Sequence, residues 1–495
     1  MNNERKETFI EYLKQKKTKT ELLILTLFYV CVYFLISSWY PFPDVYSDSW
    51  NYMLNAQRDT YAVYRPVGYS HVLQFIHGFS DSIRAIFTFQ LLALYLSNAV
   101  LIFSLKYIFN INGIAGYILS AAVVLSPCAI YMSNMIMSDS IFASLTCLFL
   151  TCVVWVLYRP KLYWLYLPIP FILFLILNIR FSGLFYPVLL IPFFFVNNKK
   201  MFWVPSLFVL ISVMFFNVYN KKQMKQMTGV NTVLGGFGGW QWANNALHII
   251  PHVKVDANKI KKYEHQVLHQ IVMQDTAFIA KTLARRPATA EFMWDKESPL
   301  KKYLYQYMNT TGTPYMSAWV KAGIEMEEYG KDLAKQHPGA YLKYYVWPSS
   351  KSFFAADLGV ISQFDGLKPD PKDEWFFEYY SLDKNQDFGS TNDVFKSFFS
   401  KFLSGGNLFL WILTFISLGI IAVFFKKLDL NAAQKKIFIF LIAFSILYCG
   451  FTIIATSTEI RYIIPVTPIQ YLLIILAVLN TGYVLKGSRQ KKEKA

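Results

Sequence analysis

Long apolar stretches constrain this chain more than any other feature. A helix that crosses a bilayer needs about 20 mainly apolar residues, with a tolerated range of about 17–25. A search for such stretches predicts ten spans, at residues 20–39, 83–105, 108–126, 139–158, 162–179, 183–198, 201–218, 406–425, 437–456 and 463–485. The composition agrees, because 55% hydrophobic and 18% aromatic residues in a chain of 495 exceed what a soluble protein carries. We therefore predict an α-helical polytopic membrane protein with about ten transmembrane helices.

Two of these segments, 162–179 and 183–198, are short and contain prolines. The prolines are Pro168, Pro170, Pro187 and Pro192. Proline is tolerated in a span where neighbouring groups satisfy the freed backbone, so we expect kinked helices here and not loops. The first span follows charged residues and precedes no small-residue cleavage site, which favours a retained helix over a signal peptide.

Basic residues indicate how the chain is oriented. Lys and Arg gather before the first span, after the last one and in alternate connections between them, in greater number than the net charge of +17. By the positive-inside rule these segments are cytoplasmic. We therefore expect both termini to lie in the cytoplasm. The Lys-rich termini are compatible with a bacterial inner membrane. The basic balance is then explained by topology and does not indicate a nucleic-acid partner.

The predicted spans divide the chain into three parts. Residues 1–218 form an N-terminal transmembrane module whose first outer loop is 40–82, and residues 406–495 form a C-terminal transmembrane module with a cytoplasmic tail. Between the seventh and eighth spans, residues 219–405 are expected as a large soluble domain on the outer face. With roughly 185 residues, this segment is long enough for a core of its own. Its sequence predicts helices at 256–287 and 318–336.

All seven histidines lie in segments expected on the outer face, and two pairs of them have i,i+4 spacing. Pro251 argues against a helix through His248 and His252. The second pair, His265 and His269, lies in HQVLH, which lacks the glutamate of an HExxH metal motif. We therefore expect an ordinary helix face at this pair.

Polar residues also mark the outer ends of several spans. The first loop holds Asp44 and Asp48 among aromatic residues and ends in Arg65-Pro-Val-Gly-Tyr. Asp139 starts the fourth span within MSDS, where it could be a plain helix cap. Arg180 in NIRFSG and Arg461 in RYIIPVTP could simply extend to the membrane interface.

The order and common sidedness of these motifs resemble the lipid-dependent glycosyltransferases of the GT-C superfamily. That superfamily includes the protein O-mannosyltransferases and the aminoarabinose transferase of lipid A. The motifs are an acid in the first outer loop (SDSWNY), an Arg-Pro stretch (YRPVGY), a second acid (MSDS), NIRFSG and RYIIPVTP. Two features depart from the family pattern: Ser49 follows Asp48 where an Asp-Glu pair is common, and segment 219–405 interrupts the spans.

The resemblance implies a glycosyltransferase that uses a polyprenyl-phosphate sugar donor. The acceptor would be a hydroxyl of a glycan, a lipid or a protein, and a single displacement would invert the anomeric configuration. Asp48 would act as the base, with Asp44 second, and Asp139 could orient the loop or share a Mg²⁺ or Mn²⁺ ion with Asp48. The lipid phosphate would bind Arg461, Arg180 and Arg65, because guanidinium groups stay charged and pair bidentately with phosphate. The tyrosines expected to contact the acceptor or shape the loop are Tyr52, Tyr64 and Tyr69.

Three other classes of function stay open. A polysaccharide polymerase or ligase acting on lipid-diphosphate glycans also fits ten spans with a large outer domain, but it would not need the acid in the first loop. A transporter should place charges at mid-span, whereas here they lie mostly at span ends. A non-enzymatic scaffold would lose no function when Asp48 is replaced.

Overall fold

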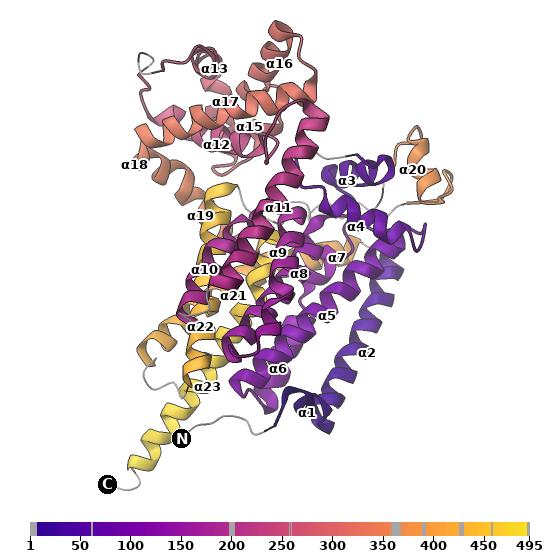
Figure 1. The fold of residues 1–495 in the computed structure, drawn as a ribbon, viewed down its shortest axis with the longest axis vertical. Helices are drawn as coiled ribbons and strands as arrows, with labels where there is room; N and C mark the ends of the chain where they lie inside the picture. The colour runs from indigo at the N-terminus through magenta and orange to yellow at the C-terminus, as the bar shows by residue number, and fades with distance from the viewer. Residues whose placement is uncertain are drawn as a thin grey trace.

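The computed structural model of the chain describes residues 7–60, 63–197, 203–256, 258, 260–356, 358, 367, 369–388, 393–424, 430–456 and 459–492. These residues form helices joined by turns. They contain no β-strand, and their one isolated β-bridge joins Asp44 to Met135. A bundle of long helices makes up one part of the molecule, and shorter helices gather at one end of it (Figure 1).

Within the described residues, eight segments are long and apolar enough to cross a membrane. They are α2 (Lys16–Trp39), α5 (Arg84–Phe109), the pair α6 (Gly113–Val124) and α7 (Pro127–Ser133), α8 (Ser138–Tyr158), α11 (Trp203–Thr228), the latter part of α21 (Asp393–Phe424), α22 (Ala432–Ala455), and η8 (Ile460–Val466) with the start of α23 (Thr467–Lys492). The prediction of a helical polytopic membrane protein is thus confirmed at the level of fold class.

The two proline-bearing segments form shorter elements. The first is split into a 3₁₀ turn, η1 (Tyr163–Tyr166), and α9 (Pro168–Ile179), and the second into η2 (Phe181–Phe185) and α10 (Tyr186–Asn197). Pro168 starts α9, a position where its missing N–H costs nothing. A helix of 12 residues is about 18 Å long, short of the roughly 30 Å of a bilayer core. The described residues therefore contain eight segments long enough to cross a membrane and two shorter apolar helices. Three of the expected spans begin or end at residues that are not among the described ones, namely 198, 201–202 and 425.

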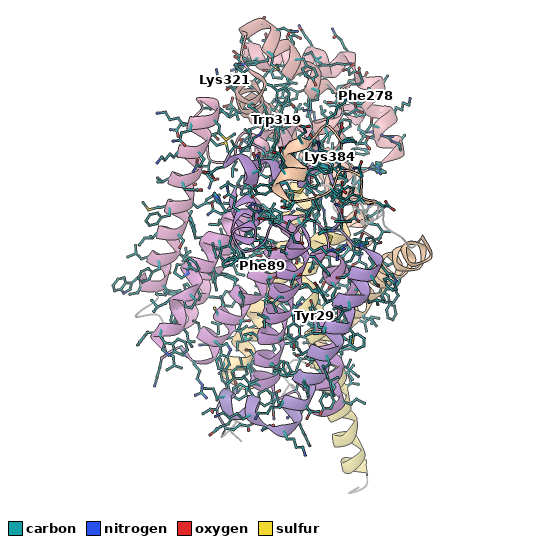
Figure 2. The ribbon with its side chains drawn as sticks, turned by 90° about the vertical axis from the view of Figure 1, so that its right-hand side faces the viewer. Tyr29, Phe89, Phe278, Trp319, Lys321 and Lys384 are labelled. Carbon is teal, nitrogen blue, oxygen red and sulfur yellow. The ribbon has the colours of Figure 1, made fainter. Side chains whose placement is uncertain are left out.

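The surface of the bundle is apolar where lipid would contact it. On α2, five large apolar side chains are each more than half exposed: Leu23, Ile24, Leu27, Phe28 and Phe34. A soluble protein rarely exposes so continuous an apolar face. Figure 2 shows Tyr29, also on α2, within the helix bundle, below Trp319 and Phe278.

The helices at the end of the bundle form a domain with its own core. They are α12 (Phe237–Leu247), η3 (Ile250–His252), α13 (Tyr263–Gln274), α14 (Thr276–Arg285), α15 (Glu291–Trp294), α16 (Pro299–Thr311), α17 (Tyr315–Gln336), α18 (Pro338–Tyr341) and the π-helical turn η5 (Leu342–Val346). The next helix, α19 (Trp347–Phe354), packs on the bundle, where Phe353 contacts Trp411 of α21. Trp240 and Trp319 stack at the centre of the domain core, with ring centroids 3.9 Å apart. Gly239 and Gly323 let α12 and α17 approach closely, since a Cβ on Gly239 would lie 1.7 Å from the Gly323 carbonyl oxygen.

The edges of this domain differ from the expected boundaries at residues 219 and 405. Helix α11 runs without a break from the bundle to Thr228, and α21 begins at Asp393. The expected helix at 256–287 is two helices, α13 and α14, while the one at 318–336 is confirmed as α17. The domain also bonds to the bundle, because the side chains of Asn245 and Tyr345 donate to the Ile454 carbonyl at the end of α22.

The expected first outer loop, residues 40–82, contains α3 (Ser47–Arg58) and α4 (Gly68–His77). Both helices lie at the same end of the bundle as the domain, near the small α20 (Glu374–Tyr379) (Figure 1). Helix α1 (Phe9–Lys14) lies at the opposite end of the bundle. The loop is therefore a helical layer at the end of the bundle that carries the domain, which we call the domain end.

Candidate active site

Asp48 lies in the first turn of α3, with its side chain 20% exposed. Arg65, from the stretch before α4, lies with Nη2 at 3.0 Å from Asp48 Oδ2. Burial raises the pKa of the Asp48 carboxyl, but Arg65, and then Arg461, outweigh it, so this pKa lies below its ordinary value. Asp48 is therefore an ionised carboxylate that solvent can still reach.

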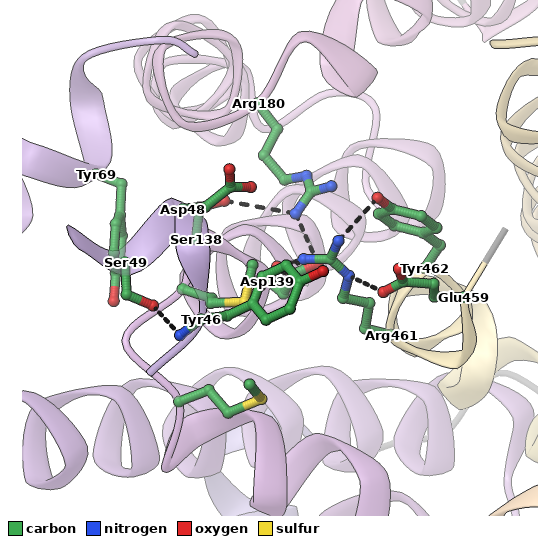
Figure 3. Close-up of polar contacts among 12 residues, drawn as sticks. Tyr46, Asp48, Ser49, Tyr69, Ser138, Asp139, Arg180, Glu459, Arg461 and Tyr462 are labelled. Carbon is green, nitrogen blue, oxygen red and sulfur yellow. Dashed lines mark hydrogen bonds and ion pairs between the residues drawn. The ribbon is translucent and has the colours of Figure 1, made fainter. Parts of the chain in front are cut away.

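Asp139, in the first turn of α8, holds two further arginines together. Arg180 Nη1 lies 2.6 Å from one Asp139 carboxylate oxygen, and Arg461 Nη1 lies 3.4 Å from the other. The two arginines come from different places, one just after α9 and the other from the turn before α23. Figure 3 shows both guanidinium groups converging on Asp139. Asp139 therefore joins three elements that are far apart in the sequence.

Arg461 is buried among polar partners and does not extend to the surface of the molecule. Its side chain is 6% exposed, its Nε lies 2.8 Å from Glu459 Oε2, and its Nη2 donates to the Tyr462 hydroxyl at 3.1 Å. Both Arg461 and Arg180 also stack over the Tyr462 ring, at 4.9 and 5.2 Å from its centroid. Sequence reasoning placed neither Glu459 nor Tyr462 in the site. The sequence offered one sign that they belong there, because both lie within two residues of Arg461 in the stretch EIRY.

Gly68 explains part of the YRPVGY motif. A Cβ at this position would lie 2.5 Å from the backbone oxygen of Asn178, near the end of α9. Only glycine permits this approach, which brings the start of α4 against the helix that precedes Arg180. The motif thus positions Arg65 and Arg180 at the same end of the bundle.

Together these side chains form what we call the arginine cluster. Its members are Asp48, Arg65, Asp139, Arg180, Glu459 and Arg461. Three guanidinium groups face three carboxylates, so the cluster is formally neutral. A divalent cation between Asp48 and Asp139 would meet the repulsion of these guanidinium groups, whereas an anion could replace a carboxylate as their partner. The donor set therefore fits an anionic ligand better than Mg²⁺ or Mn²⁺.

Asp44, the second expected base, has a different environment. It is 2% exposed, and its carboxylate accepts a hydrogen bond from the Tyr131 hydroxyl. Its backbone bonds to that of Asn134 and Ile136. In this arrangement Asp44 fixes the beginning of the first loop to the α7–α8 connection, and solvent does not reach it.

The three expected loop tyrosines separate into two groups. Tyr52 and Tyr69 are buried, and their hydroxyls bond to Ser138 and Gln90. They pack the loop against the bundle and do not line an open surface here.

Tyr64 instead extends into the domain. Its ring lies 4.6 Å from that of Trp319, and the neighbouring Val63 belongs to the domain core. Next to it, Lys301 is surrounded by aromatic rings, with Nζ 4.3 Å from the Trp319 centroid. Burial lowers the pKa of Lys301 to about 8. Tyr64 thus couples the first loop, and with it Arg65, to the domain.

No protein-family model, no curated protein and no solved structure matches this chain. The function has to be inferred from the residues of the arginine cluster themselves.

Proposed function

We propose that the chain is an integral membrane glycosyltransferase that moves a sugar from a polyprenyl-phosphate donor to an acceptor hydroxyl. One observation carries this proposal: three arginines from distant segments gather around two carboxylates at one end of an apolar helix bundle. Arg65 pairs with the partly exposed Asp48, while Arg180 and Arg461 pair with the buried Asp139. A lipid-linked phosphate would place its negative head group at such an end of the bundle. The polyprenyl chain would lie along the bundle, where the exposed side chains are apolar.

The arginines would stabilise the leaving phosphate. As the bond between the anomeric carbon and the phosphate oxygen breaks, the electron pair stays on that oxygen and negative charge grows there. Arg461, Arg180 and Arg65 would bind this charge, since guanidinium groups pair bidentately with phosphate. The buried position of Arg461 strengthens the effect, because fewer water molecules compete for its donors.

Asp48 would accept the proton of the attacking hydroxyl. The acceptor oxygen bonds to the anomeric carbon from the face opposite the phosphate, so the configuration inverts and the proton passes to the carboxylate. In the free protein, neighbouring arginines lower the pKa of Asp48 and weaken it as a base. A bound phosphate would draw their charge away and raise that pKa. Donor binding would then prepare the base for reaction.

The geometry also suggests how the protein lies in the membrane. The domain and the arginine cluster share one end of the bundle, and α1 lies at the other (Figure 1). With the basic termini in the cytoplasm, transfer would take place on the outer face of a membrane, and a bacterial inner membrane fits. Residues of the domain would then contact the acceptor, which is a glycan, a lipid or a protein.

Release of free polyprenyl phosphate tests the proposal without knowledge of the sugar. The purified protein is incubated with a panel of short-chain polyprenyl-phosphate hexoses and pentoses, with and without an extract of cell-envelope glycans, lipids and proteins as acceptors. The released lipid phosphate is measured by mass spectrometry. A parallel panel carries lipid-diphosphate glycans. We expect acceptor-dependent release from at least one monophosphate donor. Turnover of diphosphate donors alone would replace this proposal with a polymerase or ligase, and no turnover of either panel would contradict an enzymatic role.

A further inference from the structure

A second cluster of polar side chains lies in the domain, apart from the arginine cluster. His265, in the first turn of α13, points at two glutamates of α17. Its Nε2 lies 3.3 Å from Glu325 Oε2 and 3.6 Å from Glu328 Oε2. The three candidate ligand atoms all lie within 4.8 Å of one another. The acidic partners that the HQVLH stretch lacks are therefore supplied by another helix.

The histidine itself points to a ligand. His265 is 6% exposed, and its Nε2 is buried and makes no hydrogen bond, although two carboxylates lie close to it. A buried polar nitrogen without a hydrogen bond costs free energy, and native proteins rarely retain one without a role. Its neighbour His269 differs, because its Nδ1 bonds to the Tyr329 hydroxyl.

We propose that His265, Glu325 and Glu328 bind a Zn²⁺ ion that joins α13 to α17. Zinc binds histidine nitrogen at about 2.0–2.1 Å and carboxylate oxygen at about 2.0–2.2 Å in tetrahedral geometry, which separates neighbouring ligand atoms by about 3.4 Å. The distances from His265 Nε2 to the two glutamate oxygens agree with this separation. Three protein ligands leave the fourth position for water.

In the structure, the ammonium group of Lys262 lies where the proposed Zn²⁺ ion would bind. Its Nζ lies 2.5 Å from Glu325 Oε2 and 3.2 Å from Glu328 Oε2. The Lys262 side chain is 40% exposed and can swing into solvent. Zn²⁺ must displace the ammonium group, and removal of that group should therefore tighten metal binding.

The experiment is a Zn²⁺ titration of the full-length protein in detergent, after EDTA treatment and against a chromophoric chelator. We expect one Zn²⁺ per chain, with an affinity that falls about tenfold or more in His265→Ala and in Glu325→Gln. Lys262→Ala should bind Zn²⁺ more tightly than the wild type. Glu327→Gln is the matched control, because Glu327 lies on the same helix but pairs with Lys331 and should leave the affinity unchanged.

Two further measurements distinguish a zinc ion at His265 from zinc bound elsewhere on the protein. Zn²⁺ should raise the melting temperature of the wild type but not of His265→Ala, because binding to the folded state alone stabilises it. Asp48→Asn should bind Zn²⁺ as the wild type does, which places the ion outside the arginine cluster. The proposal is overturned if the wild type binds no Zn²⁺, if His265→Ala binds it equally well, or if Lys262→Ala weakens binding. The Lys262 variant removes a partly exposed side chain, so it keeps the test decisive even if His265→Ala fails to fold.

Discussion

The two ends of the helix bundle each hold a buried group of charges, and the two groups differ in kind. Away from the domain, Lys106 of α5 pairs with Glu21 of α2, and the Lys106 ammonium also donates to the Ser120 hydroxyl. Both side chains are less than a tenth exposed, and one cation meets one anion. At the domain end, the arginine cluster combines three cations with three carboxylates, and several members are reached by solvent.

We interpret this difference as that between a structural ion pair and the proposed ligand site. A closed pair satisfies its own charges and leaves no donor for another molecule. The arginine cluster has a 3.4 Å contact between Arg461 and Asp139, and Asp48 is open to solvent on one side. An anion could enter here and replace a carboxylate partner. Substitutions in the arginine cluster should therefore change catalysis, whereas substitutions in the closed pair should change stability.

The largest effect is expected at Asp48. Asp48→Asn keeps the size and hydrogen bonding of the side chain but cannot accept a proton, so the transfer rate should fall by about 10²–10⁴. The rate of lipid phosphate release measures this. Asp59→Asn is the matched control, because Asp59 ends the same helix and bonds to Gln74 away from the cluster. If Asp48→Asn turns over like the control, Asp48 is not the base.

Substitutions in the Lys106–Glu21 pair should change the stability of the protein and not its transfer rate. Lys106→Met leaves the Glu21 carboxylate buried without its cation, which should cost about 3–5 kcal/mol of stability. The double variant Glu21→Gln/Lys106→Met should regain most of this, because no unpaired charge remains. Thermal unfolding in detergent measures both, and the folded fraction should keep its transfer rate. Equal melting temperatures of the single and double variants would contradict the structural role.

Arg461→Lys should lower activity by a smaller amount. Lysine keeps the charge but loses the bidentate geometry, so transfer should lose about 1–3 kcal/mol of transition-state stabilisation. The measured quantity is kcat/KM for the donor. Arg286→Lys, an exposed change in the domain, serves as the control. A value of kcat/KM for Arg461→Lys equal to that of the control would contradict bidentate binding of the phosphate by Arg461.

A shift in pH dependence is the smallest expected effect. Because arginines lower the pKa of Asp48, the base should stay ionised at neutral pH, and its activity should be lost only as pH falls through that low value. Arg65→Met removes the largest influence that lowers the pKa of Asp48, so that burial, which raises this pKa, is opposed only by Arg461 and Arg180. As the pH is lowered, the variant should therefore begin to lose kcat/KM at a higher pH than the wild type does. Superimposable pH profiles would contradict the coupling between Arg65 and Asp48.

The fold class could be predicted from the sequence because each span is a local property. Apolar runs of sufficient length identify α5, α8 and α22 without knowledge of their neighbours. The segments around Pro168 and Pro192 were harder, since proline can kink a span or shorten it. The edges of the domain were also missed, because α11 extends past its apolar part into polar sequence.

The candidate site shows the same limit. The motifs indicated Asp48, Asp139 and the three arginines, but which arginine meets which acid depends on helix packing. Asp44 and Asp48 have similar sequence surroundings, yet Asp44 is buried and bonded to Tyr131, whereas Asp48 is partly exposed to solvent. The glutamates that face His265 lie 60 and 63 residues further along the chain, so no local spacing could reveal them.

Direct binding of a lipid phosphate is the measurement closest to the proposed phosphate site. A radiolabelled short-chain polyprenyl phosphate is titrated onto the purified protein in detergent, with the matching unphosphorylated polyprenol as competitor. We predict saturable binding that polyprenol does not displace, weakened about tenfold or more in Arg461→Ala and retained in Asp48→Asn. Binding that polyprenol displaces equally well, or that is unchanged in a well-folded Arg461→Ala protein, would contradict a phosphate site in the arginine cluster.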